Sequence, residues 1–277
     1  LPLWSTYYFL GLYVGDHEPR WRSDSSHILD RYILAKTRDL IDATTTEYEA
    51  LDSPMAAQHL RNFADVLTNW YVRRSRDRFW AGSDTDALDT LYTVLETLCR
   101  VAAPLAPLIT EEVWRGITGG ESVHLCDWPK VEDFPADAEL VATMDRVRDV
   151  ASAGLALRKA HSRRVRLPLT TLTIVSEGAR DLVGFSDIIA EELNVAGIEC
   201  VDLDDHAIQR FGIGQKLIPN SRALGPRVGG AIQGIIARAK AGEWSIEKGV
   251  VTVGDTELQE GEYTLELTSA SEETAVS

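Results

Sequence analysis

Apolar residues recur every three or four positions through most of the first 160 residues. The spacing is clearest in three stretches, which we expect to be amphipathic helices: Ile28 to Ile41, Met55 to Tyr71 and Leu88 to Val101. Weaker repeats predict a helix near the start of residues 1–22, another over about 107–117, and a last one over about 138–155. Long amphipathic helices joined by short loops predict an antiparallel bundle.

Capping residues and helix breakers mark the ends of these helices. Residues 23–26, Ser-Asp-Ser-Ser, are N-cap candidates for the helix near Ile28, and Pro54 suits the first turn of the next one. The Gly-Ser-Asp of residues 82–84 ends that second helix, which is therefore predicted to continue past residue 71, and caps the third. Pro104 and Pro107 stop the third helix, and the glycines at 119–120 end the fourth.

Beyond residue 168 the periodic segments become shorter and alternate between strand and helix patterns. Strands are predicted at residues 172–175, 195–203, 207–213, 250–253 and 263–267, and helices at 185–193 and 227–240. The fold class is therefore mainly α, an antiparallel helical bundle followed by a small α+β domain. We place the bundle, with a connecting N-terminal segment, at 1–134, the C-terminal helix and α+β domain at 135–268, and a disordered tail at 269–277.

The composition is that of a globular protein, with 44% hydrophobic and 26% charged residues among 277. No uncharged apolar run is long enough to span a bilayer, and the start lacks an initiator Met and a signal peptide, so we expect a piece of a longer cytoplasmic protein without a membrane partner. The three cysteines, which are far apart, suit a reducing compartment.

The net charge of −15 argues weakly against binding to nucleic acid. Whether the chain binds nucleic acid therefore depends on where its basic residues cluster.

Motifs of catalysis are missing from the sequence. There is no phosphate-binding G-x-x-x-x-G-K-[ST] loop, no H-E-x-x-H pair among the six histidines, no C-x-x-C pair and no nucleophile elbow. Neighbouring acids such as those at 111–112 and 204–205 are interpreted as solvated charges. We therefore expect no catalytic residue, no metal site and no cofactor within this chain.

Binding chemistry is concentrated in residues 69–80, Asn-Trp-Tyr-Val-Arg-Arg-Ser-Arg-Asp-Arg-Phe-Trp, which we call the arginine–aromatic segment. Arginine donates paired hydrogen bonds to phosphate, and aromatic rings stack on unpaired bases, which favours RNA as the ligand. On a helix Arg74 and Arg78 share a face, with Trp70 one turn before Arg74. The candidate RNA-binding residues here are Trp70, Arg73, Arg74, Arg76 and Arg78.

A structural interpretation of the same segment stands beside the functional one. Arg73 and Arg74 could both pair with Asp77 at helical spacing, and Trp70, Phe79 and Trp80 could belong to the core. For each single arginine the structural role is the commoner one, whereas the segment as a whole favours RNA.

A second basic run lies at residues 158–166, Arg-Lys-Ala-His-Ser-Arg-Arg-Val-Arg, and contains no acid. Cations at the end of a helix complement its dipole, which is the structural alternative. Five cations exceed that need, so we expect contacts with phosphate. The candidate residues of this basic run are Arg158, Lys159, Arg163, Arg164 and Arg166.

The arginine–aromatic segment resembles a signature of the helical anticodon-binding domain of isoleucyl-tRNA synthetases, which are class I enzymes. Other stretches resemble the same family in the same order along nearly the whole chain, and the ordered set is specific although each stretch alone is weak. They lie at residues 1–9, 29–34, 103–114, 123–129, 164–169, 192–195, 219–220 and 224–229. Leu167 departs from the family pattern, which has Gln at this place.

The resemblance implies a function that composition alone does not give. The full-length family member attaches L-isoleucine to isoleucine-specific tRNA with ATP and Mg²⁺ and edits misloaded valine, whereas the ATP-binding signatures His-Ile-Gly-His and Lys-Met-Ser-Lys-Ser are absent from this chain. We expect a monomeric tRNA-binding part, inactive alone, that does not bind DNA. The alternatives are a non-catalytic protein-interaction module and the equivalent domain of another class I synthetase, such as the valine enzyme.

Overall fold

The computed structural model describes residues 2–81, 84–247 and 250–269. They form two compact units, residues 1–144 and 145–277, which we call the helical unit and the C-terminal unit. The predicted class, a mainly α bundle followed by a small α+β region, is confirmed. The unit boundary lies inside α7 (Ala138–Ala160), so this helix begins in the helical unit.

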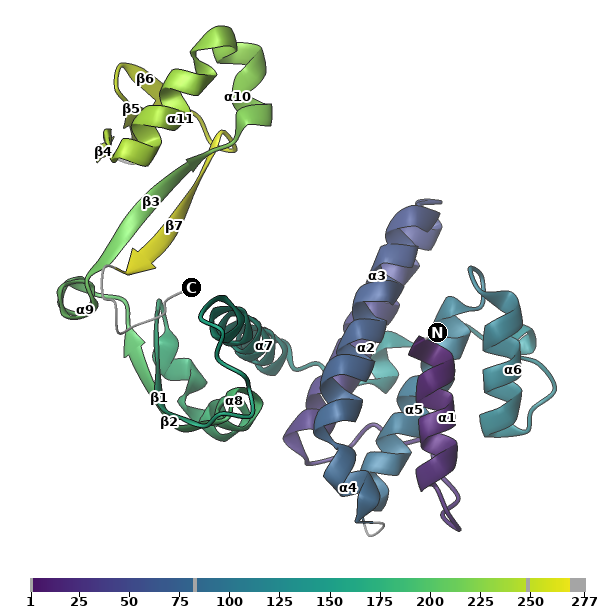
Figure 1. The fold of residues 1–277 in the computed structure, drawn as a ribbon. Coiled ribbons are helices and arrows are strands. Elements are labelled where there is room, and N and C mark those ends of the chain that lie inside the picture. Colours follow the sequence, from purple (N-terminus) through teal and green to yellow (C-terminus); the bar gives the residue numbers. More distant parts are fainter. Residues whose placement is uncertain (1, 82–83, 248–249, 270–277) are drawn as a thin grey trace. The chain divides into compact units, whose positions relative to one another are not determined.

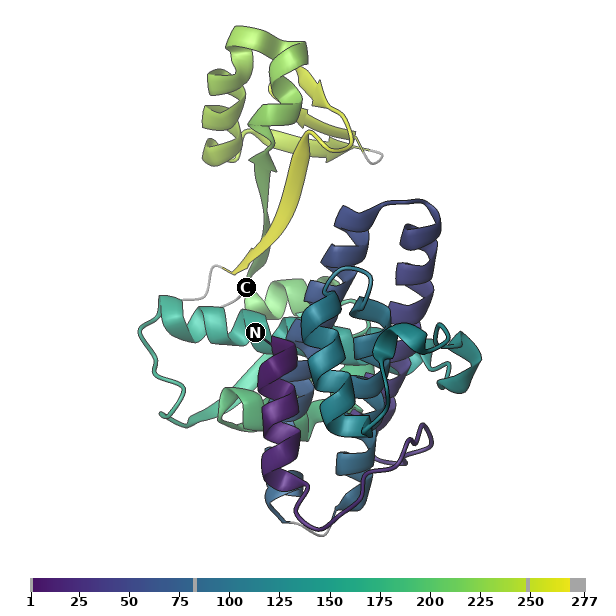
Figure 2. The same ribbon diagram turned by 90° about the vertical axis from the view of Figure 1, so that its right-hand side faces the viewer.

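The helical unit is a bundle built on two neighbouring long helices, α2 (Ile28–Glu49) and α3 (Ser53–Asp65), with α5 (Thr85–Ala102) against α2 and α6 (Pro107–Thr118) against α5 (Figures 1 and 2). The short helix α1 (Pro2–Tyr13) packs against α5 and α6. Fully buried side chains at helical spacing form the core of the helical unit, as the periodicity predicts: Tyr32, Ile33, Ile41, Leu67, Tyr71, Leu91 and Leu95. Two short 3₁₀ turns, η2 (Val123–Leu125) and η3 (Val131–Asp133), follow α6.

Two local predictions in the helical unit are wrong. The N-cap of α2 is His27, whose ring accepts from the Leu29 N–H, and not one of residues 23–26. The second helix is not continuous either. It widens into a π-helix, η1 (Val66–Val72), breaks at the buried Ser75, and resumes as α4 (Arg76–Trp80). The apolar repeat did not reveal this change, because a π-turn shifts the periodicity over only a few residues.

Other predicted ends of the bundle helices are confirmed. Asp84 caps α5 by accepting from the Ala87 N–H, and Gly119 ends α6 with a positive φ of 68°. The predicted contribution of Gly82 and Ser83 lies outside the described residues.

The first part of the C-terminal unit is a β–α–β arrangement. Strand β1 (Leu169–Ser176) runs parallel to β2 (Val195–Asp202), with Leu169 opposite Val195, and η4 (Ala179–Phe185) and α8 (Ser186–Leu193) connect them. Ile174, Leu182, Ile189 and Leu193 are buried in this part. The predicted strand over 172–175 and helix over 185–193 are confirmed.

The second part is carried by an antiparallel strand pair, β3 (Ile213–Pro219) and β7 (Tyr263–Ser269), which lie side by side in Figure 1. Between them the chain forms α10 (Ser221–Val228), η5 (Gly229–Ala231), α11 (Ile232–Ala241) and an antiparallel sheet of β4 (Trp244–Glu247), β5 (Val250–Val253) and β6 (Thr256–Leu258). Leu217, Leu224, Ile235, Val251 and Val253 belong to its core.

Two predictions for this part are wrong. Residues 207–213 are not a strand: Asp204 caps the short helix α9 (Asp205–Phe211), and Gly212 ends it with a positive φ of 58°. The helix predicted over 227–240 is divided, because Gly229 takes φ 52° and ψ −123°, a conformation that glycine adopts readily. The tail predicted to be disordered lies, from residue 270 onward, outside the described residues.

Candidate nucleic-acid interface

A buried carboxylate on α2 organises the arginine–aromatic segment. Asp30 is fully buried and accepts hydrogen bonds from Ser25 Oγ at 2.7 Å and from Tyr71 OH at 2.9 Å. Arg78 completes the shell with two parallel bonds, of 2.6 and 2.8 Å, to the two carboxylate oxygens. This bidentate geometry is the strongest that an arginine and a carboxylate make, so Arg78 holds the start of α4 onto α2.

Arg78 has two further partners at helix starts. Its Nε lies 2.7 Å from Asp84, the N-cap of α5, and its Nη1 lies 3.0 Å from Nδ1 of His27, the N-cap of α2. Burial alone would lower the pKa of Arg78, but its hydrogen bonds to Asp30 and Asp84 raise that pKa above the usual value. The guanidinium therefore stays charged and links α4 to the N-terminal ends of α2 and α5.

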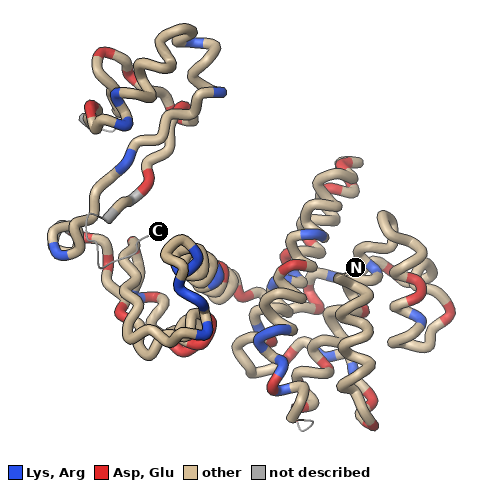
Figure 3. The backbone as a smooth tube through the Cα atoms, in the orientation of Figure 1, with Lys and Arg blue, Asp and Glu red and all other residues tan. Residues whose placement is uncertain are grey.

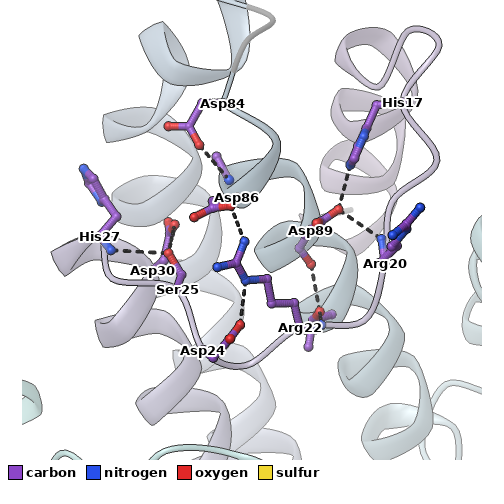
Figure 4. A network of polar contacts seen from close by, with 12 residues as sticks. His17, Arg20, Arg22, Asp24, Ser25, His27, Asp30, Asp84, Asp86 and Asp89 are labelled. Carbon is purple, nitrogen blue, oxygen red and sulfur yellow. Dashed lines mark hydrogen bonds and ion pairs between the residues drawn. The ribbon is translucent and has the colours of Figure 1, made fainter.

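The chain between α1 and α2 adds a second set of polar contacts to this region (Figure 4). His17 Nε2 and the Arg20 N–H lie 2.7 and 3.0 Å from the same oxygen of Asp89 on α5. Arg22 pairs with Asp24 and with Asp86. These contacts fix the connecting segment against the N-terminal half of α5.

His27 gives this region a pH dependence. Burial and the positive charge of Arg78 lower the pKa of His27 below 6.5, although Asp30 and Asp84 oppose the shift. The unfolded chain therefore binds the proton more readily than the folded chain, so the stability that neutral His27 contributes is present above pH 6.5 and is lost as the pH falls below it. Protonation also removes the acceptor that caps α2.

We expect the difference in unfolding free energy between the native protein and a His27→Asn variant to change between pH 7.5 and 5. Asn keeps a capping oxygen but does not titrate, so the native protein should lose about 1 kcal/mol, the usual contribution of an N-cap, relative to the variant on acidification. Urea unfolding of both proteins at several pH values measures this difference. A constant difference across the range would contradict the assignment.

The other members of the arginine–aromatic segment divide between the core and the surface. Trp70 is only 5% exposed, and the guanidinium of the half-buried Arg74 lies 5.6 Å from the centre of its ring. The predicted one-turn spacing of these two residues is thus present, as a packed pair. Arg73 and Arg76 are exposed, and Arg73 Nε donates to the Asn69 carbonyl at 2.8 Å. Trp70 and Arg78 therefore face the protein, whereas Arg73 and Arg76 are accessible to a ligand.

The basic run divides in a similar way. Arg158 is buried at the end of α7, but Lys159, Arg163, Arg164 and Arg166 are exposed. All eight residues from 161 to 168, which we call the basic loop, are exposed. Figure 3 shows Lys and Arg gathered at the turn that follows α7. The basic loop is thus an accessible cationic surface on an acidic protein.

Sequence analysis missed two residues near these surfaces. Trp80 was not among the candidate binding residues, but it is 61% exposed and donates from Nε1 to Tyr13 OH at 2.6 Å. Asn194, which has a positive φ of 49°, bonds to the basic loop from the turn before β2. An Asn between a helix and a strand is a signal for a left-handed turn, but it does not indicate which loop its side chain contacts.

Among the described residues, no helix is both long and apolar enough to cross a membrane. Within the same ranges, no three His, Cys, Asp or Glu residues come together as a set of metal ligands.

Comparison with known proteins places these features in a family. Residues 30–173, just over half of the chain, match the model of the anticodon-binding domain of tRNA ligase. The chain is 54% identical over 272 residues to the isoleucine–tRNA ligase of Leifsonia xyli, covering 96% of this chain and 24% of that protein. For the isoleucine–tRNA ligases of Nocardia farcinica and Mycobacterium leprae the identities are 50% and 48%, over 98% and 99% of this chain and 26% and 25% of those proteins. The chain spans about a quarter of the length of these curated relatives.

Proposed function

Because the chain belongs to the anticodon-binding domain family of tRNA ligases, we propose that it is the tRNA-binding part of an isoleucine–tRNA ligase. The observation that carries the proposal is that some basic residues face the protein whereas others are exposed to solvent. Arg158 is buried and Arg78 is partly buried, and both organise their surroundings, while Arg73, Arg76, Lys159, Arg163, Arg164 and Arg166 are exposed. Exposed guanidinium groups suit contacts with RNA phosphates.

The negative charge of the rest of the chain favours a complex in which RNA lies against the exposed cationic stretches. The chain carries a formal net charge of −15, so an RNA backbone is repelled by most of its surface and attracted to the few exposed cationic stretches. Phosphate contacts fix the position of an RNA, whereas unpaired bases are distinguished by stacking and by hydrogen bonds to their edges. Arg73 and Arg76, with the exposed ring of Trp80 nearby in sequence, are the groups of the helical unit that suit such contacts.

For the whole protein we propose the activity by which the relatives are named. It would join L-isoleucine to isoleucine tRNA in the cytoplasm as a monomer, with ATP and Mg²⁺ bound by residues outside this chain, and it would remove misattached valine. A hydrophobic pocket rejects a ligand that lacks one methylene only weakly, which is why such editing is needed. This chain would contribute by positioning the tRNA.

Fluorescence anisotropy tests the proposal. The chain is titrated with an isoleucine tRNA transcript and with a copy carrying a different anticodon, each at two salt concentrations. We expect affinity that falls as salt rises and that is at least about tenfold weaker for the exchanged anticodon, since each lost base contact is worth about 1–3 kcal/mol. Equal affinity for both transcripts would limit the function to a grip on the backbone. The absence of binding to both would contradict the proposal.

A second candidate function is supported by a separate observation. Trp4, Tyr8 and Leu12 of α1 are 41%, 61% and 59% exposed and recur every four residues, so they form one apolar row on the helix. Such a row is typical of a helix that packs against another protein surface. If both transcripts fail to bind, a non-catalytic protein-interaction module becomes the better interpretation.

A further inference from the structure

The carbonyl groups of the basic loop converge on one buried side chain. Arg158 is 5% exposed, and its Nη2 donates to the Arg164 carbonyl at 2.7 Å, to the Val165 carbonyl at 3.2 Å and to the Leu167 carbonyl. Arg158 also accepts through its own carbonyl from the Arg163 N–H at 2.7 Å. The loop is therefore wrapped around the guanidinium at the end of α7.

Asn194 holds the basic loop from the other side. Its side-chain amide donates to the Val165 carbonyl at 2.9 Å, and its carbonyl accepts from the Leu169 N–H at 3.1 Å, at the start of β1. Asn194 adopts the left-handed conformation, with φ 49°, that asparagine tolerates better than most residues. Two polar side chains from different elements thus fix one short loop.

Three carbonyl groups of the basic loop, those of Arg164, Val165 and Leu167, are thus engaged by side chains. In the part of the chain that the structure describes, the amide N–H groups of Arg164, Val165 and Arg166 have no hydrogen-bond acceptor. No described carboxylate lies within ion-pair distance of Arg158, so its charge is solvated only by loop carbonyls. Its buried Nε and Nη1 have no partner among the described residues either. Such a surface suits a polyanion, because free donors and an uncompensated cation both favour negative charge.

We propose that Arg158 is a positioning residue for RNA: it does not touch the RNA but holds the basic loop so that Arg163, Arg164 and Arg166 grip the phosphate backbone. The inference rests on the proposed function, since it names the residue on which the tRNA contact of this loop depends. A loop ordered before binding does not lose conformational entropy during binding, so removing Arg158 should weaken the affinity without removing any direct contact.

Limited digestion by trypsin tests, without any RNA, whether Arg158 holds the basic loop in place. Arg158→Gln should accelerate cleavage after Arg163, Arg164 and Arg166, because loosened loops are the preferred sites of proteolysis. Arg146→Gln is the matched control. Arg146 lies earlier on α7 and donates to the carbonyls of Glu177 and Gly178, at 2.8 and 3.0 Å, in a different turn. It should leave the cleavage rate of the basic loop unchanged.

A thermodynamic cycle tests whether Arg158 affects RNA binding through the arginines of the basic loop. The dissociation constant for isoleucine tRNA is measured for the native chain, for Arg158→Gln, for a variant with Gln at 163, 164 and 166, and for the combination. We expect Arg158→Gln to weaken binding by about tenfold, the order of an ordering penalty. In the background of the triple variant the same change should have less than about a twofold effect, because coupled residues are not additive. Asn194→Gly, which keeps the left-handed turn, should weaken binding in the same direction.

The outcomes separate the inference from the function. If the triple variant loses affinity while Arg158→Gln and Asn194→Gly do not, the positioning role is wrong and tRNA binding by the loop stands. A full additional loss in the combined variant would mean that Arg158 acts independently of the loop, which also overturns the inference. If Arg158→Gln fails to fold, the cycle is completed with Asn194→Gly. If the native chain does not bind tRNA, the proposed function fails, and the digestion still shows whether Arg158 holds the loop.

Discussion

Replacing Arg78 by methionine should lower the free energy of unfolding of the helical unit by about 3–5 kcal/mol, the usual effect of removing one partner from a buried ion pair. Asp30 is fully buried, and among the described residues only Ser25 and Tyr71 would remain to donate to it in the variant. The variant also loses the bond from Arg78 to Asp84, the residue that caps α5. Methionine has a similar length but offers no donor, so the carboxylate charge is left uncompensated.

Tryptophan fluorescence during urea unfolding reports on this unit, because six of the seven tryptophans (residues 4, 21, 70, 80, 114 and 128) lie in it. Arg76→Met is the matched control. It removes the same charge from the same short helix, but Arg76 is exposed, so its unfolding free energy should stay within about 0.5 kcal/mol of the native value. Equal effects of the two substitutions would mean that the Arg78–Asp30 pair contributes nothing that a surface arginine does not.

The same comparison clarifies the role of Arg78 in RNA binding. The side chain of Arg78 is 15% exposed and engaged with Asp30, Asp84 and His27. We expect Arg78→Met to weaken tRNA binding only as far as it unfolds the helical unit, and low temperature or a stabilising osmolyte should restore most of the lost affinity. Arg76→Met should weaken binding without any change in stability.

The helical half of the fold was predictable because each helix buries a stripe of apolar residues. Apolar residues therefore recur along the sequence with the period of a helix. The errors arose where one or two residues decide the backbone. Gly229 divides a long helical pattern, and Asp204 with Gly212 converts an expected strand into α9. Strands β3, β4 and β6 were not predicted. Strands β4 and β6 have only four and three residues, too few for a clear alternation, and β3 pairs with β7, which lies far along the chain.

The candidate site was predictable as two cationic stretches but not residue by residue. Arg73, Arg74, Arg76 and Arg78 look alike in the sequence, and only the break at Ser75 and the distant Asp30 distinguish Arg78 as the partner of a buried carboxylate. The family resemblance is confirmed by the match of residues 30–173, whereas the candidate binding residues stay a prediction. Which arginines are exposed depends on tertiary contacts, such as those of Arg158 with the basic loop, that no spacing rule encodes.

Replacing Arg163, Arg164 and Arg166 together by glutamine should weaken binding to isoleucine tRNA by about a hundredfold, since three contacts of about 1 kcal/mol each add to about 3 kcal/mol. All three side chains are exposed on the basic loop. Each neutralised phosphate contributes about one unit to the slope of log affinity against log salt, so the magnitude of that slope should fall by about three. Because backbone contacts do not depend on sequence, a transcript with an exchanged anticodon should lose affinity by the same factor.

Three other arginines of the C-terminal unit provide a control with the same change in charge. Arg180, Arg210 and Arg238 lie 3.1, 3.0 and 4.0 Å from Asp202, Glu199 and Glu243, respectively. Their charges are already offset by neighbouring carboxylates, so substituting all three by glutamine should leave the salt slope within about one unit of the native value. Equal losses in the two triple variants would show that RNA responds to the total charge of the unit. A loss confined to the basic-loop variant would show that the exposed loop after α7, with no acid in its sequence, is the place where phosphate binds.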